Sequence, residues 1–372
     1  MRVRLAVLAG ALALVAPALA SPPDVGGRAY FVQNGSTGEV LLSFRARERV
    51  PIASITKLMT VLVALEHARL DDVVTVGGHA AAVGESTINL RRGERLTVRE
   101  LVEAALIQSA NDAAAALAEY VGHGSQSSFI ALMNAKARRL RLADTHFVNP
   151  DGLDTAGHYS SARDVTKLAR VAMHVPFVRE TVRQTGASIS GNRRLHTWND
   201  LLYSFPRLLG VKTGHTSGAG WSEVAAARGR GVTIYATLLG EPTRGQRNED
   251  LTALLAWGLS RYRVVPVVQR GRVYASAQTP YGRRPLQLVA TRPLLRVVRV
   301  DRPLVERVSV PAAVALPVVR GRRVGEVRVY AGKRLLASAP LVAERSIPRP
   351  GLASRVGWYL RRTAHNMWKW VT

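Results

Sequence analysis

The sequence contains no cysteine and none of the common metal-binding or nucleotide-binding patterns. Without cysteine the chain has no disulfide, no thiol nucleophile, no iron–sulfur cluster and no cysteine-ligated zinc. The nine histidines show neither an H-E-x-x-H pattern nor a paired spacing, and no phosphate-binding loop or dinucleotide-binding glycine pattern occurs. The sequence therefore predicts a protein that works without a metal ion or an organic cofactor.

Acidic residues are also scarce, with 26 Asp and Glu against 52 Lys and Arg and a formal net charge of +26. The excess is concentrated after residue 260, where 23 basic residues accompany only 4 acidic ones. A basic surface of this kind suits a polyanion such as membrane headgroups, an anionic cell-wall polymer or nucleic acid. The alternative is that arginine-rich codon usage has merely produced a solvated surface.

The N-terminus has the organisation of a secretory signal peptide. A short basic start precedes the apolar run Leu5 to Val15, and Ala18-Leu19-Ala20 is an A-x-A cleavage site before Ser21. The apolar run is too short to span a membrane comfortably. We expect residues 1–20 to be removed and the mature protein to work outside the cytoplasmic membrane, which argues against nucleic acid as a partner. An uncleaved N-terminal anchor is the alternative.

Residues 22–262 are typical of a mixed α/β domain. Two short strands flank a Gly-containing turn, several amphipathic helices follow, and three further strands precede a last helix over residues 249–261. This order predicts one sheet that joins N-terminal strands to C-terminal strands. Residues 263–345 consist of short β-branched runs bounded by Pro, Gly and Arg, which predicts a small all-β domain.

Residues 350–372 form a third region with the pattern of an amphipathic helix. Leu352, Val356, Tyr359 and Leu360 share one face, basic residues lie elsewhere, and several tryptophans flank the apolar stripe. Such a helix is suited to lie in a membrane interface. The alternative is a helix docked on the β domain.

Three short motifs carry the candidate chemistry. Ser54-Ile55-Thr56-Lys57 lies at the start of a predicted helix, so the hydroxyl and the amine lie on one face. Ser109-Ala110-Asn111 interrupts two apolar helices, and Lys212-Thr213-Gly214 ends a predicted strand. Each motif alone is weak, because a capping serine or an ordinary loop explains it. Their ordered combination is that of serine penicillin-binding proteins and class A β-lactamases.

With these motifs and their flanking segments, the sequence resembles the low-molecular-mass penicillin-binding proteins that are D-alanyl-D-alanine carboxypeptidases. The resemblance extends over essentially the whole chain. The segments that carry it are Pro51–Thr60, Ile107–Ala113, Asp151–Asp154, Tyr159–Asp164 and Gly210–Trp221. It implies a β-lactamase/transpeptidase-like antiparallel sheet with helices on both faces, followed by a small all-β domain and the C-terminal amphipathic helix.

The same resemblance implies the reaction. Ser54 would attack the D-Ala–D-Ala peptide bond of peptidoglycan stem pentapeptides, with Lys57 as a neutral base whose pKa is lowered by burial and by Lys212. Ser109 would pass a proton to the departing D-Ala, and Asn111 would hydrogen-bond the amide of the substrate. Such an enzyme serves peptidoglycan maturation and cell shape at the periplasmic face of the cytoplasmic membrane. β-Lactams would acylate it as covalent inhibitors.

The remaining site residues would bind the negative charges of the reaction, which are the oxyanion and the terminal carboxylate of the substrate. The resemblance places the oxyanion hole at the backbone N–H groups of Ser54 and His215, next to Gly214. Thr213 and a cation would hold the terminal carboxylate of the substrate. Our candidate for that cation is Arg247, which lies ten residues before Trp257; the alternative is a surface arginine at the start of a helix.

Two other functions remain to be distinguished. A class A-like β-lactamase would carry a glutamate that activates the deacylating water, but no E-x-x-L-N pattern occurs between Asn111 and Lys212, where Asp151 and Asp154 lie instead. We therefore expect slow deacylation. A non-catalytic cell-wall-binding scaffold would lack Ser54 or Lys57, and both are present. The stem-peptide variant, the use of water or an amine as acceptor, and the oligomeric state are left open.

Overall fold

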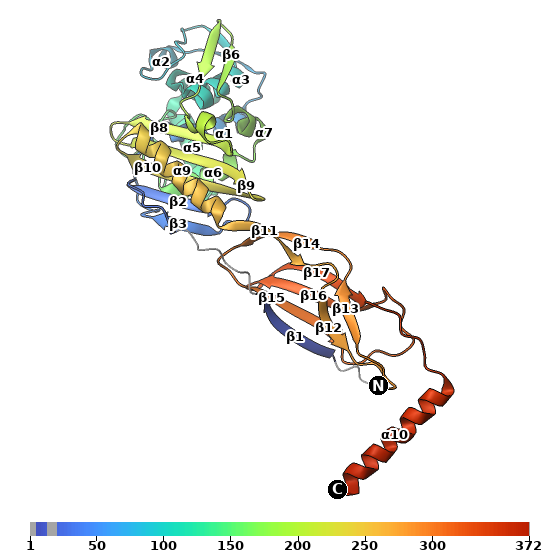
Figure 1. Cartoon of the computed structure of the whole chain (residues 1–372). Coiled ribbons are helices and arrows are strands. Elements are labelled where there is room, and N and C mark those ends of the chain that lie inside the picture. Colours follow the sequence, from blue (N-terminus) through green and yellow to red (C-terminus); the bar gives the residue numbers. More distant parts are fainter. Residues whose placement is uncertain (1–4, 13–20, 372) are drawn as a thin grey trace. The chain divides into compact units, whose positions relative to one another are not determined.

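The computed structural model describes the backbone of residues 5–12 and 21–371, and the side chains of residues 21–361 and 363. The chain divides into two compact units: one spans Ala20–Ser260, and the other comprises Met1–Leu19 and Arg261–Thr372 (Figure 1). The division falls at Ser260, close to the boundary expected near residue 262. Each unit has its own hydrophobic core.

The first unit is built on a five-stranded antiparallel sheet with the order β3-β2-β10-β9-β8. Its strands are β2 (Ala29–Asn34), β3 (Val40–Phe44), β8 (Leu208–Thr216), β9 (Gly220–Gly229) and β10 (Val232–Glu241). The order places the N-terminal hairpin beside the C-terminal strands, as the sequence predicts. Strand β8, which carries Lys212-Thr213-Gly214, is an edge strand.

Helices cover both faces of this sheet. Helix α9 (Arg244–Ser260) lies across β10, β9 and β2, where a side chain at Gly258 would contact Ile234 (Figure 1). Helix α6 (Ala162–Ala172) packs on β10 and β2, and its Thr166 hydroxyl hydrogen-bonds Thr237 at 2.6 Å. Ile234 and Thr237 are three residues apart on one strand, so their side chains point to opposite faces. The predicted mixed α/β class is confirmed.

Two central helices position the site. Helix α1 (Lys57–His67) is buried from Lys57 to Ala64, and it packs on the alanine-rich helix α4 (Asn111–Val121), whose small side chains permit close approach. A 3₁₀ turn, η1 (Ala53–Thr56), leads into α1, and a π-helical turn, η2 (Ala104–Gln108), precedes α4. The other elements of the unit are β4 (Val73–Thr75), α2 (Gly78–Ala82), β5 (Arg95–Thr97), α3 (Val98–Glu103), α5 (Gln126–Arg139), α7 (Pro176–Thr181), β6 (Gly186–Ile189), β7 (Arg193–His196) and α8 (Leu201–Ser204).

The second unit is rich in β-strands. Its six-stranded sheet has the order β1-β15-β16-β17-β13-β12, and β11 pairs with β14. Strand β1 (Leu5–Leu12), within the predicted signal peptide, pairs antiparallel with β15; the expected cleavage site at Ala18-Leu19-Ala20 lies outside the described residues. The other strands are β11 (Tyr262–Val268), β12 (Val273–Ala277), β13 (Leu286–Ala290), β14 (Leu294–Arg299), β15 (Leu304–Pro311), β16 (Arg323–Ala331) and β17 (Arg334–Ala343).

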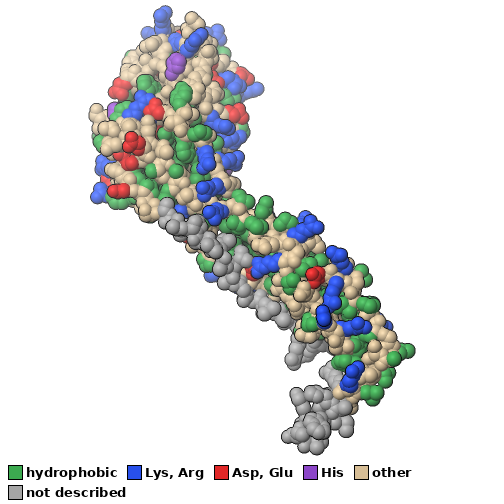
Figure 2. All heavy atoms as spheres, viewed as in Figure 1, with side chains coloured by type: hydrophobic (Ala, Val, Ile, Leu, Met, Phe, Trp, Pro, Cys, Tyr) green, Lys and Arg blue, Asp and Glu red, His purple; other side chains and the backbone are tan. Residues whose placement is uncertain are grey.

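The basic excess of this second unit is not balanced by its few acidic residues. Asp301 pairs with Arg299 and Arg261, Glu306 with Arg272, and Glu326 with Arg328. Three of the four carboxylates between residues 261 and 372 are thus already paired with arginine, and the unit keeps a large positive charge. On the face of this unit visible in Figure 2, Lys and Arg side chains are accordingly frequent and acidic ones are few.

The C-terminal helix α10 (Leu352–Val371) leaves the aliphatic side chains of its apolar stripe uncovered. Trp358 packs edge-on against Tyr281 at 5.5 Å between ring centroids, while Leu352, Val356 and Leu360 are 76%, 56% and 66% exposed. Tyr359 of the stripe also lies edge-on to Tyr281, at 6.2 Å between ring centroids. Helix α10 therefore contacts its own unit through these two aromatic side chains, while the three aliphatic side chains of the stripe stay uncovered. Among the described residues, no helix is long and apolar enough to cross a membrane.

A buried carboxyl pair joins the end of β10 to α9 in the first unit. Glu241 is 1% exposed, and no described residue donates a hydrogen bond to either of its carboxylate oxygens. Burial and the neighbouring Asp250 carboxyl raise the pKa of Glu241 to about 7. Asp250 in turn accepts a hydrogen bond from the Gly26 N–H at 2.9 Å. Glu241 is therefore protonated at acidic pH.

Replacing Glu241 with glutamine should make the free energy of unfolding less sensitive to a rise in pH. The native carboxyl binds its proton more tightly than the unfolded one, so its stabilising effect is complete below about pH 4.5 and is lost as pH rises through about 7. Relative to wild type, Glu241→Gln should gain about 1 to 2 kcal/mol of unfolding free energy between pH 5 and pH 8. Urea unfolding at both pH values measures this. The exposed Glu249→Gln is the control, and an equal gain in it would contradict the assignment.

Candidate active site

Ser54 lies in the 3₁₀ turn η1, not within the α-helix that the sequence predicts there. The turn has three residues per repeat, so side chains at i and i+3 stand above one another. This geometry brings Lys57, the first residue of α1, directly to the hydroxyl: Lys57 Nζ lies 2.8 Å from Ser54 Oγ. Ala53, just before the serine, has the left-handed φ of 45°. A strained residue at this point is consistent with a turn held in place by its surroundings.

Close packing of backbones holds this turn. A Cβ at Gly214 of β8 would lie 2.8 Å from Ile52 O and 3.1 Å from Ser54 N. Only glycine therefore lets β8 pass this close to the backbone N–H of Ser54. Gly152, at φ 91°, meets the other side of the turn, where a Cβ would lie 1.9 Å from Ala53 O. The oxyanion hole that the family resemblance implies would lie here, where β8 passes the backbone N–H of Ser54.

Lys57 is fully buried and saturated with acceptors. Besides Ser54 Oγ, its Nζ donates to Asn111 Oδ1 at 2.7 Å and to Asp151 O at 2.8 Å. Burial lowers the pKa of Lys57 to about 8, against the attraction of nearby carboxylates, chiefly Asp151. A neutral amine is therefore accessible near physiological pH, and in that form Nζ accepts the proton of the Ser54 hydroxyl. Burial is thus the main cause of the lowered pKa of Lys57, and the repulsion between Lys57 and Lys212 lowers the pKa of Lys212 as well.

Lys212 reaches the second motif instead. Its Nζ lies 3.0 Å from Ser109 Oγ and 3.1 Å from Thr213 O. Burial first, and then the charge of Lys57, lowers the pKa of Lys212 well below its ordinary value. Ser109 adopts φ 65° at the end of η2, which turns its side chain out of the helix line and toward the cleft. The second motif thus contacts both of the others: Asn111 bonds Lys57, and Ser109 bonds Lys212.

Asn111 faces Lys57. Its Oδ1 accepts from Lys57, and its Nδ2 donates to Gly84 O at 3.1 Å. Its residue is 3% exposed and does not line the cleft. In the described structure Asn111 therefore orients the lysine.

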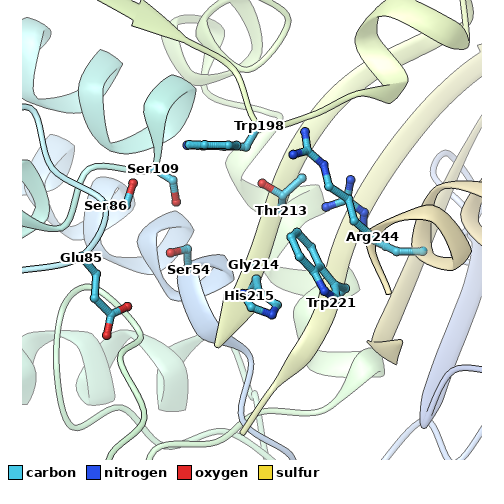
Figure 3. Close-up of a pocket in the computed structure, with 11 residues that line it drawn as sticks. Ser54, Glu85, Ser86, Ser109, Trp198, Thr213, Gly214, His215, Trp221 and Arg244 are labelled. Carbon is cyan, nitrogen blue, oxygen red and sulfur yellow. The ribbon is translucent and has the colours of Figure 1, made fainter. Parts of the chain in front are cut away.

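A cleft of about 350 Å³ opens over Ser54 between the helical region and the edge of the sheet (Figure 3). The sequence predicts six of its lining residues, and misses others from loops, from β9 and from the start of α9. Asp151 and Asp154 do not line it, whereas Glu85 does. The lining consists of Ser54, Glu85, Ser86, Ser109, Trp198, Thr213, Gly214, His215, Trp221, Arg244 and Arg247.

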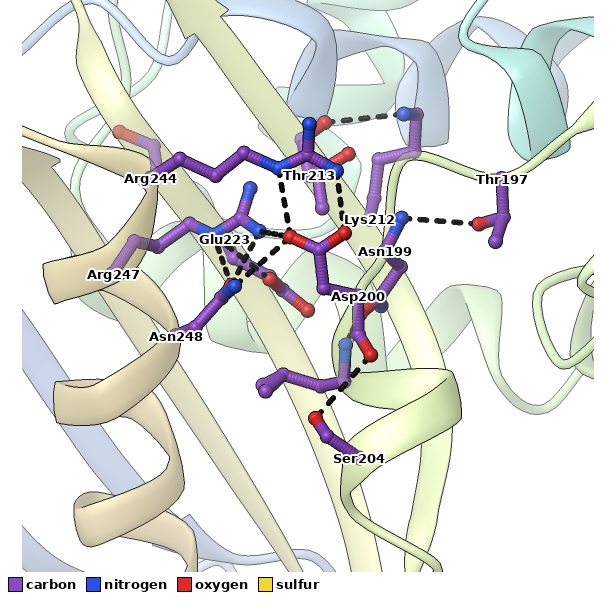
Figure 4. Close-up of polar contacts among 12 residues, drawn as sticks. Thr197, Asn199, Asp200, Ser204, Lys212, Thr213, Glu223, Arg244, Arg247 and Asn248 are labelled. Atoms are coloured by element: carbon purple, nitrogen blue, oxygen red, sulfur yellow. Dashed lines mark hydrogen bonds and ion pairs between the residues drawn. The ribbon is translucent and has the colours of Figure 1, made fainter.

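Arg247 is not a surface residue, so the alternative of a surface arginine at the start of a helix is wrong. Its side chain is 1% exposed, and its Nε lies 3.3 Å from the fully buried Glu223. Its Nη2 lies 3.4 Å from Asp200, and Nε also donates to the neighbouring Asn248 at 3.1 Å (Figure 4). Burial raises the pKa of Glu223 to about 7, although Arg247 and Lys212 oppose this. The guanidinium is thus held at the cleft wall by carboxylates from two other elements.

The arrangement has the parts for acyl transfer: a nucleophile, an adjacent amine base, a second hydroxyl bonded to a second lysine, and a cationic end. Among the described residues no group of three or more His, Asp and Glu side chains could hold a metal ion. The His215 ring stacks on Trp221, with 4.0 Å between the ring centroids. The arrangement therefore fits a serine nucleophile with a lysine base.

Comparisons with known proteins agree with this geometry. The sequence profile of D-alanyl-D-alanine carboxypeptidases, peptidase family S11, matches residues 16–243. D-alanyl-D-alanine carboxypeptidase DacD of Salmonella typhimurium is 32% identical over 97% of this chain and 99% of its own length. Penicillin-binding protein 6B from Escherichia coli matches with a TM-score of 0.65 and 28% identity, over 88% of this chain and 98% of its own.

The Streptomyces K15 DD-transpeptidase covers a smaller part, with a TM-score of 0.61 and 31% identity over 64% of this chain and 99% of its own. Both solved structures thus share the fold, and penicillin-binding protein 6B matches most of this chain. Since the profile covers more than half of the sequence and a full-length relative shares nearly a third of its residues, the chain belongs to the D-alanyl-D-alanine carboxypeptidase family of serine peptidases.

Proposed function

We propose that the protein removes the terminal D-alanine from peptidoglycan stem pentapeptides through an acyl-enzyme on Ser54. The contact that carries this proposal is the 2.8 Å hydrogen bond between Lys57 Nζ and Ser54 Oγ, at the floor of a cleft. The family membership supports the same reaction. The direct test is release of D-alanine by the wild type and by Ser54→Ala.

The reaction follows from the contacts around Ser54. Neutral Lys57 takes the hydroxyl proton as Oγ attacks the carbonyl carbon, and the oxyanion that forms faces the N–H groups of Ser54 and His215. The proton then reaches the departing amine through Ser109, which Lys212 holds at 3.0 Å. Water, or an amine in a transpeptidation, releases the acyl group and restores the Ser54 hydroxyl.

Substrate binding is assigned to the two walls of the cleft. Thr213 and Arg247 take the terminal carboxylate, because both line the end of the cleft that carries the cations. Asn111 takes the amide of the substrate by exchanging the bond between its Nδ2 and Gly84 O. A β-lactam presents the same carbonyl and carboxylate, and it acylates Ser54 in place of the peptide.

A class A-like β-lactamase is the second candidate. Asp151 and Asp154 serve structural bonds, Asp151 Oδ1 to the Leu153 N–H at 2.9 Å and Asp154 to the Thr216 hydroxyl at 2.7 Å, so neither is placed to activate water. Only the exposed Glu85 brings a carboxylate into the cleft lining. Rapid turnover of penicillin that Glu85→Gln abolishes would favour this second function. A non-catalytic scaffold has no observation in its favour, because Ser54 and Lys57 are in contact.

The protein is proposed to be exported and to associate with the outer face of the cytoplasmic membrane through α10. The signal-peptide pattern of residues 1–20 supports export. The uncovered stripe of Leu352, Val356 and Leu360, on a helix within a strongly basic unit, supports a peripheral interfacial position. The membrane surface and the peptidoglycan peptide are thus the two proposed partners.

Deleting residues 351–372 should release the mature protein from membranes. The wild type is expected to sediment with vesicles of phosphatidylethanolamine and phosphatidylglycerol, whereas the truncated protein stays in the supernatant. Val356→Ser combined with Leu360→Ser should lower binding at least tenfold by removing buried apolar area, about 1.4 kcal/mol or more. Gly357→Ser, which leaves the stripe intact, is the matched control. Retention of the truncated protein on vesicles would reject α10 as the anchor.

A further inference from the structure

A second arginine lies in the cleft beside Arg247. Arg244 is the first residue of α9 and lines the same cleft. Its side chain is 37% exposed, against 1% for Arg247. The more accessible of the two cations is therefore the one that the sequence motifs do not include.

Both guanidinium groups converge on one carboxylate. Arg244 holds Asp200 with two bonds, from Nε to Oδ2 at 2.7 Å and from Nη2 to Oδ1, and Arg247 Nη2 lies 3.4 Å from the same Oδ2. Asn248 Nδ2 fixes Oδ2 further at 2.9 Å. Asp200 thus sets two arginines side by side, although they are three residues apart at the first turn of a helix.

Each guanidinium keeps one nitrogen unused. Nε and Nη2 of both arginines make all the hydrogen bonds and ion pairs found for these side chains, and none reaches Nη1 of either from a described residue. In Figure 4 these two nitrogens point away from Asp200. The Nη1 groups of the two arginines thus offer two N–H donors on fixed side chains, and these match the two oxygens of a carboxylate.

Two tryptophans hold Arg244 between the walls of the cleft. Its guanidinium carbon lies 5.6 Å from the ring centre of Trp198 and 6.0 Å from that of Trp221. Trp198 is fixed by its Nε1–H, which donates to Gln108 O at 3.0 Å, and Trp221 is stacked on His215. Aromatic faces favour a cation and limit the motion of an exposed arginine. The Arg244 side chain is therefore oriented before any ligand binds.

The charge of this cluster also favours an anion. The two guanidinium groups lie beside one partly exposed carboxylate, that of Asp200. The second nearby carboxyl group, that of Glu223, is fully buried. Burial raises the pKa of Glu223 to about 7, so a substantial fraction of it is neutral at neutral pH. An incoming carboxylate then completes the charge balance.

We propose that Arg244 determines substrate specificity, by forming with Arg247 a two-arginine clamp for the free C-terminal carboxylate of the peptide. The inference rests on the proposed carboxypeptidase function and adds a residue to it. Nη1 of each arginine donates to one carboxylate oxygen, while Thr213 lies at the same end of the cleft. The ligand class is an acyl-D-amino acid with a free carboxylate, and peptides that end in an amide are discriminated against.

The test compares two peptides that differ only at this group. The kcat/KM for release of the last residue is measured with diacetyl-L-Lys-D-Ala-D-Ala and with its C-terminal carboxamide, for wild type and Arg244→Gln. Loss of a charged hydrogen-bond partner should lower kcat/KM for the acid about 10- to 100-fold and leave the amide nearly unchanged. Arg228→Gln, exposed on β9 and outside the cleft lining, should keep the wild-type ratio.

The outcomes separate the clamp from the proposed function. An unchanged acid-to-amide ratio in Arg244→Gln overturns the clamp while the carboxypeptidase function stands. An equal fall with both peptides shows that Arg244 only supports the fold, which also overturns the clamp. If the wild type releases the terminal residue from neither peptide, the proposed function itself fails, and the clamp fails with it.

Discussion

Ser54→Ala should form no covalent adduct with benzylpenicillin, whereas the wild type should gain one adduct per chain and keep it for many minutes. Ser54 Oγ is the hydroxyl in contact with the Lys57 amine, and only an activated hydroxyl opens the β-lactam ring. Intact-protein mass measurement detects the adduct, and peptide mapping should place it on Ser54. The expected loss is complete, since the alanine offers no nucleophile.

A second serine in the cleft provides the control. Ser86 lines the cleft, but its hydroxyl donates to Gln108 O at 3.1 Å and contacts no amine. Ser86→Ala should therefore still be labelled at Ser54. Labelling of Ser54→Ala would show that another residue is the nucleophile. Rapid loss of the wild-type adduct would favour the β-lactamase alternative over slow deacylation.

Lys57→Met should lower the acylation rate by about 10³- to 10⁴-fold, because general-base assistance has this magnitude. Methionine fills a similar volume, and the site of Lys57 is fully buried, so the apolar side chain is compatible with its surroundings. The loss of donors to Asn111 and Asp151 O costs about 1–3 kcal/mol of stability. Thermal unfolding checks that the variant is folded.

The pH dependence of acylation in the wild type is a second test of the role of Lys57. Only the neutral amine accepts the Ser54 proton, so acylation should rise with pH through about 8 and level above it. Stopped-flow acylation by a chromogenic β-lactam between pH 6 and 10 measures the curve. Lys167→Met, on the exposed side of α6, should reproduce the wild-type curve. A flat profile, or normal acylation by Lys57→Met, would contradict the role of Lys57 as the base.

The local part of the site is predictable from sequence. Ser54 and Lys57 meet because they are three positions apart, which places them on one face whether the turn is α-helical or 3₁₀. The interruption at Ser109 and the strand that ends in Lys212-Thr213-Gly214 are also local features. The family resemblance then predicts that the three motifs converge, and the structure places Lys212 Nζ 3.0 Å from Ser109 Oγ.

The cationic end of the cleft could not be predicted in the same way. Asp200, Glu223 and Arg247 come from a short helix, a strand and a long helix, and no spacing along the chain encodes their contacts. Arg244 is missed because the sequence predicts that the last helix begins at Glu249. The structure starts it at Arg244, after Thr243, whose hydroxyl accepts from the Gln246 N–H at 3.2 Å. A threonine cap before this segment was the available signal.

Release of D-alanine from a stem pentapeptide tests the central claim most directly. The purified mature protein and its Ser54→Ala variant are incubated with the peptide, and free D-alanine is measured with a D-amino acid oxidase assay. We predict stoichiometric release of the terminal residue by the wild type and no release above background by the variant. Equal release by both proteins, or none by a folded wild type, would contradict a serine D-Ala-D-Ala carboxypeptidase that acts through Ser54.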